Sequence, residues 1–185
     1  MKKSNTRLVA AVLLLTCTAI FQTGNNTSIS EQSIEAPLCL QDEVKQLITT
    51  QPGQYFRNTI RETNRSIGVI QYHVSRLLNK GAIVSFTVAN YKGFFPVAMQ
   101  HLSEKKKSAL VFLYVPKKGE ILRALVANEK IMQNELSDKL DISVQNLSYH
   151  LKSLEELGII ERERVGLTKL ITLADDLIPI LDQYC

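Results

Sequence analysis

The 185-residue sequence has no tryptophan, few aromatic residues and only three cysteines, which are Cys17, Cys39 and Cys185. These cysteines are far apart in the chain and form no CxxC pair. A disulfide scaffold or a zinc site needs closer or more numerous ligands. We therefore expect unpaired thiols and no metal. A bridge between Cys39 and Cys185, or a lipid on Cys17, remains the alternative.

Sequence signatures of catalysis are lacking as well. The chain has no glycine-rich phosphate loop, no HExxH motif and no GxSxG motif. Its three histidines, His73, His101 and His150, do not form the pattern of a catalytic triad. We therefore expect a protein that is not an enzyme and that uses no cofactor.

No apolar run is long enough to span a bilayer comfortably, which takes about 20 residues. The longest run covers residues 8–21 and follows Lys2, Lys3 and Arg7. Residues 1–21 therefore have the form of a secretory signal or a short membrane anchor. The positive-inside rule would place the three basic residues in the cytoplasm and the rest of the chain outside.

The remaining composition is that of a globular protein, with 45% hydrophobic and 22% charged residues and a formal net charge of +4. Residues 22–37 are rich in Ser, Thr, Asn and Gln and predict a flexible linker. Residues 103–108, which include three consecutive lysines, predict a basic linker between two domains. These domains are expected at residues 38–102 and 109–185.

An internal repeat relates the two predicted domains. When the chain is shifted by 77 residues, residues 66–83 align with residues 143–160 without gaps. The identical pairs are Ser66 and Ser143, Tyr72 and Tyr149, His73 and His150, Leu77 and Leu154, Gly81 and Gly158, and Ile83 and Ile160. Four further aligned pairs, 67/144, 70/147, 74/151 and 82/159, are apolar in both copies, which favours a structural repeat over chance.

Each copy has the pattern of one capped amphipathic helix. Ser66 is a favourable N-cap, and Gly81 is the expected left-handed residue at the C-terminal end. Apolar residues recur between them at helical spacing and predict one buried stripe. The stripe comprises Ile67, Ile70, Val74 and Leu77. The second copy offers Ser143, Val144, Leu147, Leu151, Leu154 and Gly158 in the same roles.

The same order of elements is predicted in both copies. The first copy has helices at 41–50, 54–63 and 67–80, then strands at 82–88 and 94–98 joined by a turn at 89–93. The second has helices at 118–128, 132–140 and 144–157, then strands at 159–164 and 170–174 joined by a turn at 165–169. A last helix at 175–184 is interrupted at Pro179. We therefore predict a mainly α fold with small β wings: two tandem winged helix-turn-helix domains after an N-terminal hydrophobic helix.

These residues resemble a known family. Residues 52–57, 72–77 and 81–83 resemble archaeal winged helix-turn-helix transcriptional regulators, and residues 148–154 and 158–160 resemble the ArsR and MarR-like branches. The resemblance covers roughly residues 40 to 175 and implies a DNA-binding regulator. The metal-binding cysteines of ArsR-type sensors have no counterpart in either predicted recognition helix, so the resemblance does not extend to metal sensing.

In such a domain the third helix enters the major groove, and phosphate contacts come from neighbouring basic residues. We expect DNA contacts from Arg57, Arg61, Arg65, Ser66, Gly68, Gln71, Tyr72, Arg76 and Lys92 in the first domain. In the second domain we expect them from Gln145, Asn146, Ser148, Tyr149 and Lys152. Gln71 suits a bidentate bond to adenine, Gly68 allows close approach of the backbone, and Lys92 is expected in the wing turn. His73 and His150 are expected to pack at the helix rim and to hydrogen-bond the backbone.

Charge distinguishes the two domains. Residues 38–102 hold seven basic and three acidic side chains, a balance of +4, whereas residues 109–185 hold nine and twelve, a balance of −3. We therefore expect the first domain to dominate affinity for DNA. The second domain binds DNA weakly or mediates pairing. Lys105, Lys106 and Lys107 either meet phosphate or keep the linker soluble.

The predicted partner is double-stranded DNA, and two further partners remain open. One is the membrane, through residues 8–21, and the other is a second copy of the chain. We expect a cytoplasmic protein, with tethering to the inner face of the membrane as one form and export as the opposing one. The alternative function is a membrane-associated or exported winged-helix module that binds proteins and not DNA.

Overall fold

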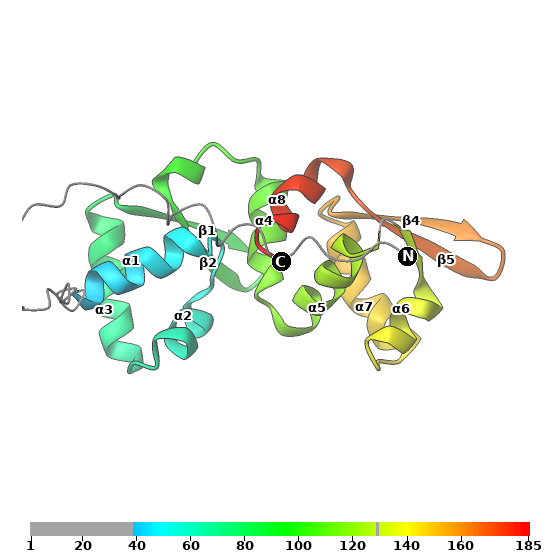
Figure 1. The fold of residues 1–185 in the computed structure, drawn as a ribbon, viewed down its shortest axis with the longest axis horizontal. Coiled ribbons are helices and arrows are strands. Elements are labelled where there is room, and N and C mark those ends of the chain that lie inside the picture. Colours follow the sequence, from blue (N-terminus) through cyan, green and yellow to red (C-terminus); the bar gives the residue numbers. More distant parts are fainter. Residues whose placement is uncertain (1–38, 129) are drawn as a thin grey trace, which may run out of the picture. The chain divides into compact units, whose positions relative to one another are not determined.

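A computed structural model describes residues 39–128 and 130–185 (Figure 1). The predicted signal-like segment, the predicted linker at 22–37 and Cys17 lie outside these residues. Within the described part of the chain, no helix has the length and apolar character needed to cross a membrane. Cys39 and Cys185 are both exposed and free, so the alternative of a bridge between them is wrong.

The first half contains three helices followed by a hairpin (Figure 1). Helices α1 (Leu40–Thr50), α2 (Phe56–Thr63) and α3 (Ile67–Asn79) precede strands β1 (Ile83–Val88) and β2 (Tyr91–Pro96). The predicted order is therefore present. The turn is shorter than predicted because Val88 pairs directly with Tyr91, which leaves Ala89 and Asn90 as the two turn residues. Ala89 adopts a φ of 49°, a left-handed conformation of the kind that two-residue hairpin turns require.

The second half repeats this order with one addition. Helices α5 (Pro116–Val126), α6 (Gln133–Lys139) and α7 (Val144–Glu155) precede strands β4 (Ile160–Val165) and β5 (Thr168–Leu173). A short strand, β3 (Lys130–Met132), pairs antiparallel with β5 and gives a three-stranded sheet of order β3-β5-β4. The sequence did not predict β3, because three residues are too few for an alternating pattern to show. The chain then forms a short 3₁₀ turn (Asp175–Leu177) and α8 (Ile178–Asp182).

The ends of the two repeated helices agree with the predictions in all but one detail. Gly81 and Gly158 have φ values of 64° and 65°, the left-handed conformation expected after each helix. Ser143 caps α7 by accepting a hydrogen bond from the Asn146 amide at 3.2 Å. Ser66 occupies the same position before α3, but its side chain caps nothing. The predicted capping role of Ser66 is therefore wrong in this structure.

The predicted apolar stripes are buried except at their first residues. Ile70, Val74 and Leu77 of α3 lie in the core, as the matching leucines of α7 do. Ile67 is 62% exposed and Val144 is 43% exposed, so their assignment to the stripe is wrong. At 100° per residue each lies at the edge of its stripe, and each stands on the first helical turn.

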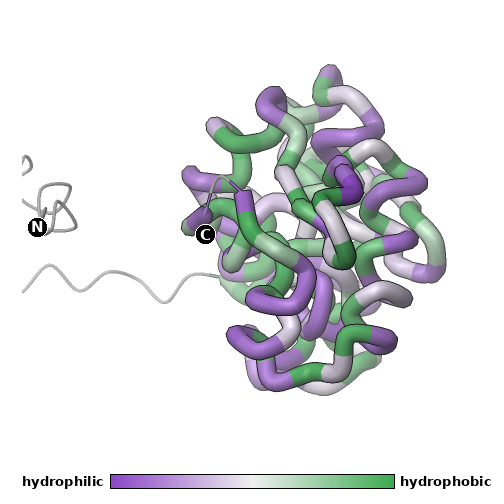
Figure 2. Tube along the Cα trace, turned by 90° about the vertical axis from the view of Figure 1, so that its right-hand side faces the viewer, coloured by the Kyte–Doolittle hydropathy of each residue, from purple (hydrophilic) through white to green (hydrophobic). Residues whose placement is uncertain are grey.

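Residues 103–108, which the sequence predicted to be a basic linker, form the start of a helix. Ser103 caps helix α4 (Glu104–Leu113) by accepting from the Lys106 amide at 3.3 Å, and residues 108–113 are all buried. The apolar end of α4 belongs to a core cluster with Tyr55 and Phe95 of the first half and with Leu151 of the second. Figure 2 shows hydrophilic stretches largely at the outer turns of this compact part.

Two of the three lysines of α4 are engaged by the protein itself. Lys105 forms an ion pair with Asp176 at 2.6 Å, and Lys107 donates to the Gln100 carbonyl at 2.7 Å. Lys107 also lies 5.8 Å from the centre of the Phe86 ring. For these two lysines the structure therefore supports neither of the predicted roles, because both hold α4 against its neighbours.

Candidate nucleic-acid interface

Helix α3 presents an uncovered polar face. The predicted contact residues Ser66, Gly68, Gln71, Tyr72 and Arg76 are all exposed. The Arg76 guanidinium donates a hydrogen bond to the Tyr72 hydroxyl at 3.3 Å, one helical turn away. This face meets the requirement of a recognition helix, whose exposed side chains must be free to contact base edges.

Exposed apolar side chains accompany these polar groups. Ile67 is 62% exposed, Val69 40% and Tyr72 59%. On α7, Val144 and Tyr149 occupy the positions of Ile67 and Tyr72 in the repeat and are also exposed. Apolar side chains in the major groove contact thymine methyl groups. The sequence analysis missed Ile67 as a candidate because apolar periodicity assigned it to the core, and it assigned no role to Val69.

Basic residues of α2 and β2 lie around one hollow. Arg57, Arg61 and Lys92 line it together with Asn90 and Pro116, and no carboxylate is among its lining residues. All three cations are exposed, and none forms an ion pair with another described residue. Three uncompensated cations around one hollow can bind phosphate. Arg65 is also exposed but lies outside this group.

Lys92 connects this hollow to α3. It also lines a second hollow with Gln71 and Ser75, so α3 and the basic residues of α2 adjoin the same lysine. Lys92 does not lie in the wing turn, as the sequence predicted, but within β2 opposite Thr87. The correction follows from the two-residue turn, which starts β2 at Tyr91.

Helix α7 presents a similar face. Gln145, Asn146, Tyr149 and Lys152 are exposed, whereas Ser148 is half-buried. Tyr149 is 73% exposed. The Lys152 ammonium lies 3.9 Å from the Glu156 carboxylate, with both side chains largely in solvent. Such a pair contributes little and leaves Lys152 available.

Neither histidine side chain hydrogen-bonds a backbone atom of the described residues, so that part of the prediction is wrong. Each is half-buried and lies edge-on to the tyrosine before it, with ring centres 5.2 Å apart for Tyr72 and His73 and 5.4 Å for Tyr149 and His150. Their Nδ1 atoms are buried and have no partner among the described residues. Burial lowers the pKa of His150, and nearby Lys118 and Lys117 lower it further.

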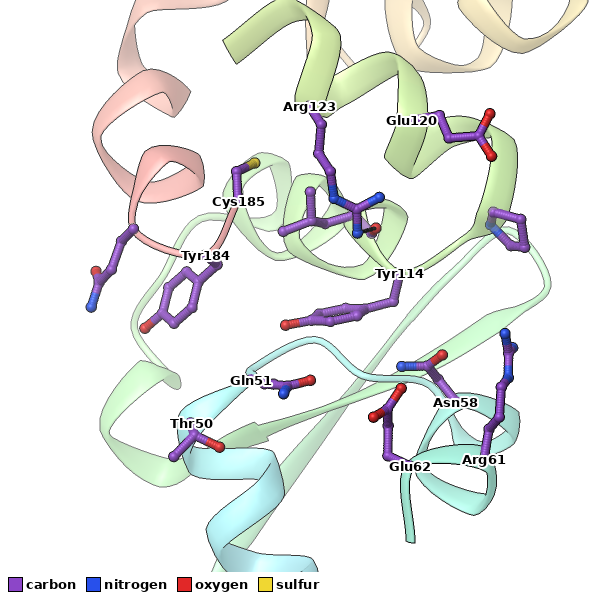
Figure 3. A pocket seen from close by; sticks show the side chains of 13 residues that line it. Thr50, Gln51, Asn58, Arg61, Glu62, Tyr114, Glu120, Arg123, Tyr184 and Cys185 are labelled. Carbon is purple, nitrogen blue, oxygen red and sulfur yellow. Dashed lines mark hydrogen bonds between the residues drawn. The ribbon is translucent and has the colours of Figure 1, made fainter. Parts of the chain in front are cut away.

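A third hollow, of about 630 Å³, lies between the two halves (Figure 3). Its lining includes Arg61 of α2, Tyr114, Arg123 of α5 and Tyr184. Figure 3 shows the Tyr114 and Tyr184 side chains beside each other. Burial raises the pKa of Tyr114 to about 12. No sequence pattern predicted this hollow, because its residues come from four separate stretches of the chain.

Two family profiles match the chain. Residues 40–110 match an N-terminal HTH domain, and residues 116–161 match a family described as winged helix-turn-helix DNA-binding. The first match overlaps the first predicted domain, and the second match lies within the second predicted domain. Neither extends to the N-terminal segment before residue 40.

Individual proteins show weaker similarity. An uncharacterized HTH-type transcriptional regulator from Methanocaldococcus jannaschii is 23% identical over 124 residues, which is 67% of this chain and 30% of that protein. The chain thus spans about a third of the length of this curated relative.

Two solved structures also align with part of the chain. HlyU from Vibrio cholerae aligns at 24% identity and a TM-score of 0.39, over 44% of this chain and 90% of its own. A transcriptional regulator homologue from Pyrococcus horikoshii aligns at 20% identity and a TM-score of 0.37, over 44% and 87%. The two family matches confirm the predicted resemblance to helix-turn-helix proteins: each half of the chain matches a helix-turn-helix domain, and the match of the second half is described as winged and DNA-binding.

Proposed function

We propose that the protein is a transcription regulator in which two tandem winged helix-turn-helix domains bind duplex DNA. The observation that carries the proposal is the open face of α3, where Gln71 and Arg76 are exposed. Its neighbours Arg57, Arg61 and Lys92 have no carboxylate partner among the described residues. The ArsR and MarR-like character suggested by the sequence belongs to the same proposal.

In the proposed complex, α3 lies in the major groove. Gln71 and Ser66 contact base edges, and Gly68 lets the backbone approach closely, since no described atom lies within 4 Å of where its Cβ would stand. Arg57, Arg61, Arg65, Arg76 and Lys92 contact phosphates. These contacts supply affinity and salt dependence, whereas the base contacts supply the choice of sequence.

The second domain contributes through α7. Gln145, Asn146, Tyr149 and Lys152 contact DNA there, with Ser148 at the edge. Because this half of the chain is acidic overall, its contribution to affinity is the smaller one. The protein acts in the cytoplasm, where DNA is present. Tethering to the inner face of the membrane through residues 8–21 and pairing with a second copy stay predictions beside this proposal.

The test is binding of the full chain to labelled duplex DNA across a salt series. We expect log K to fall steeply and linearly with log salt. Arg57→Ala and Arg76→Ala should each reduce the steepness by about 0.9, the value for one lost phosphate contact. Lys45→Ala, an exposed lysine of α1, is the matched control and should change nothing. Binding that is absent at low salt would refute the proposal and favour the protein-binding alternative.

A further inference from the structure

The basic hollow beside α2 does not end at the first hairpin. Asn90, Tyr91 and Pro116 line it, and the same three residues line a fourth hollow, which reaches α7. The cations of this fourth hollow are Lys117, Lys118 and Lys152. We call the two together the bridging groove, whose cations are Arg57, Arg61, Lys92, Lys117, Lys118 and Lys152.

The charge of the bridging groove is predominantly positive. Its six cations face a single acidic lining residue, Glu156, which lies 3.9 Å from Lys152. Lys117 also forms an exposed pair with Glu120 at 3.0 Å. Exposed pairs are weak and exchange readily for a phosphate contact. The net negative charge of the second half therefore lies largely outside the surface that adjoins α7.

Lys118 is held in an unusual way for a surface lysine. Its ammonium lies 3.8 Å from the centre of the Phe112 ring, and the side chain is half-buried. It has no carboxylate partner among the described residues. A cation positioned by an aromatic ring and not by a carboxylate keeps its charge available to an anion.

The first hairpin forms the floor between the two helices. Tyr91 packs edge-on against Tyr55 at 5.3 Å and against Phe112 of α4 at 6.4 Å. The turn residues Ala89 and Asn90 line the fourth hollow together with Tyr149 of α7. The hairpin therefore joins the surfaces of α3 and α7 instead of projecting away from the protein.

We propose that one DNA duplex follows the bridging groove, so that α3 and α7 bind the same duplex and Lys117 and Lys118 contact the phosphates between them. This inference rests on the proposed function. It goes further by assigning two phosphate-binding lysines that sequence analysis did not select. It also makes the two domains bind DNA as a unit rather than one after the other.

The experiment compares short and long duplexes, about 12 and 30 base pairs, with the full chain. Both the affinity and the salt dependence should rise with length, at one chain per long duplex. Lys117→Gln/Lys118→Gln should weaken binding to the long duplex about tenfold and reduce its salt slope by nearly 2. Binding to the short duplex, which α3 alone can occupy, should change little. Glutamine keeps an aliphatic stem over Phe112, and unchanged thermal unfolding will show that the variant folds.

Lys45→Gln/Lys130→Gln is the matched control. It removes one exposed lysine from each half of the chain, and neither lines the groove. An equal effect of both double variants, or two short duplexes bound per chain, would overturn the inference while Arg57→Ala still tests the proposed function. A shift in oligomeric state without a change in salt slope would overturn it too, because the groove would then bind a second copy.

Discussion

The Arg76 guanidinium donates a hydrogen bond to the Tyr72 hydroxyl at 3.3 Å on the open face of α3. Because an arginine side chain has many rotamers, this contact limits where its charge can lie before DNA arrives. Tyr72→Phe should therefore weaken DNA binding severalfold without altering the salt slope. Arg76→Ala should lower both the affinity for DNA and the salt slope. Fluorescence anisotropy at two salt concentrations separates the cases, and an identical salt slope for Arg76→Ala and the parent chain would contradict this role.

Gly68 and Gly119 offer a paired prediction. A Cβ at Gly68 meets no described atom within 4 Å, whereas one at Gly119 collides with the backbone carbonyl of Leu113. Gly68→Ala should raise the free energy of unfolding by up to about 1 kcal/mol, since alanine favours helix. Gly119→Ala should lower it by about 1–3 kcal/mol. Denaturant unfolding measures both.

The same Gly68→Ala variant tests the close approach of α3 to DNA. If the backbone at Gly68 approaches the bases, the added methyl group should weaken DNA binding even though the protein becomes more stable. A variant that is more stable and binds DNA as tightly as the parent would exclude close approach at this position. Stability and binding are thus expected to change in opposite directions.

Acid should weaken the contact between α7 and β4. The Arg162 guanidinium, which is hydrogen-bonded to Glu155, holds the pKa of that carboxyl below its ordinary value of 4.5. A lowered folded-state pKa gives stability that is present above pH 4.5 and is lost as pH falls through the folded-state value. Glu155→Gln should cost no more than about 1 kcal/mol at pH 7, because the pair is partly exposed. The cost, measured by denaturant unfolding at pH 7 and in acid, should vanish in acid.

The charge of Lys118 should also affect the pKa of His150. Burial is the largest cause of the lowered pKa of His150, and Lys118 is the next. Lys118→Gln should therefore raise that pKa while leaving it below the ordinary 6.5. An NMR titration of the His150 ring measures the change, with Lys45→Gln as the control. No change in Lys118→Gln would mean that the lysine does not lie beside the histidine in solution.

Local patterns predicted most of the fold, because the repeat made each element appear twice. The αL glycines Gly81 and Gly158 and the buried leucines of α7 could be read from spacing alone. The pattern failed at Ile67 and Val144, because an apolar residue on a first helical turn looks the same whether it faces the core or DNA. It also failed at Lys92, whose place depends on a turn that is three residues shorter than predicted.

The candidate interface was only partly predictable. Arg57, Arg61 and Gln71 were selected as single residues, but their grouping around Lys92 is a tertiary arrangement. Lys117 and Lys118 were missed because they begin a helix of the acidic half, where net charge argued against phosphate binding. Local charge on one surface, not the balance of a whole domain, decides whether an anion can bind there.

The edge-on packing of Tyr91 between Tyr55 and Phe112 has a consequence for operator design. If α3 and α7 bind one duplex as proposed, their connection through a shared hairpin prevents them from rotating freely to follow a spacer of any length. Target sites should therefore be strict in phasing. Five extra base pairs between the two contacted stretches, about half a turn of B-DNA, should turn one stretch to the far side of the duplex.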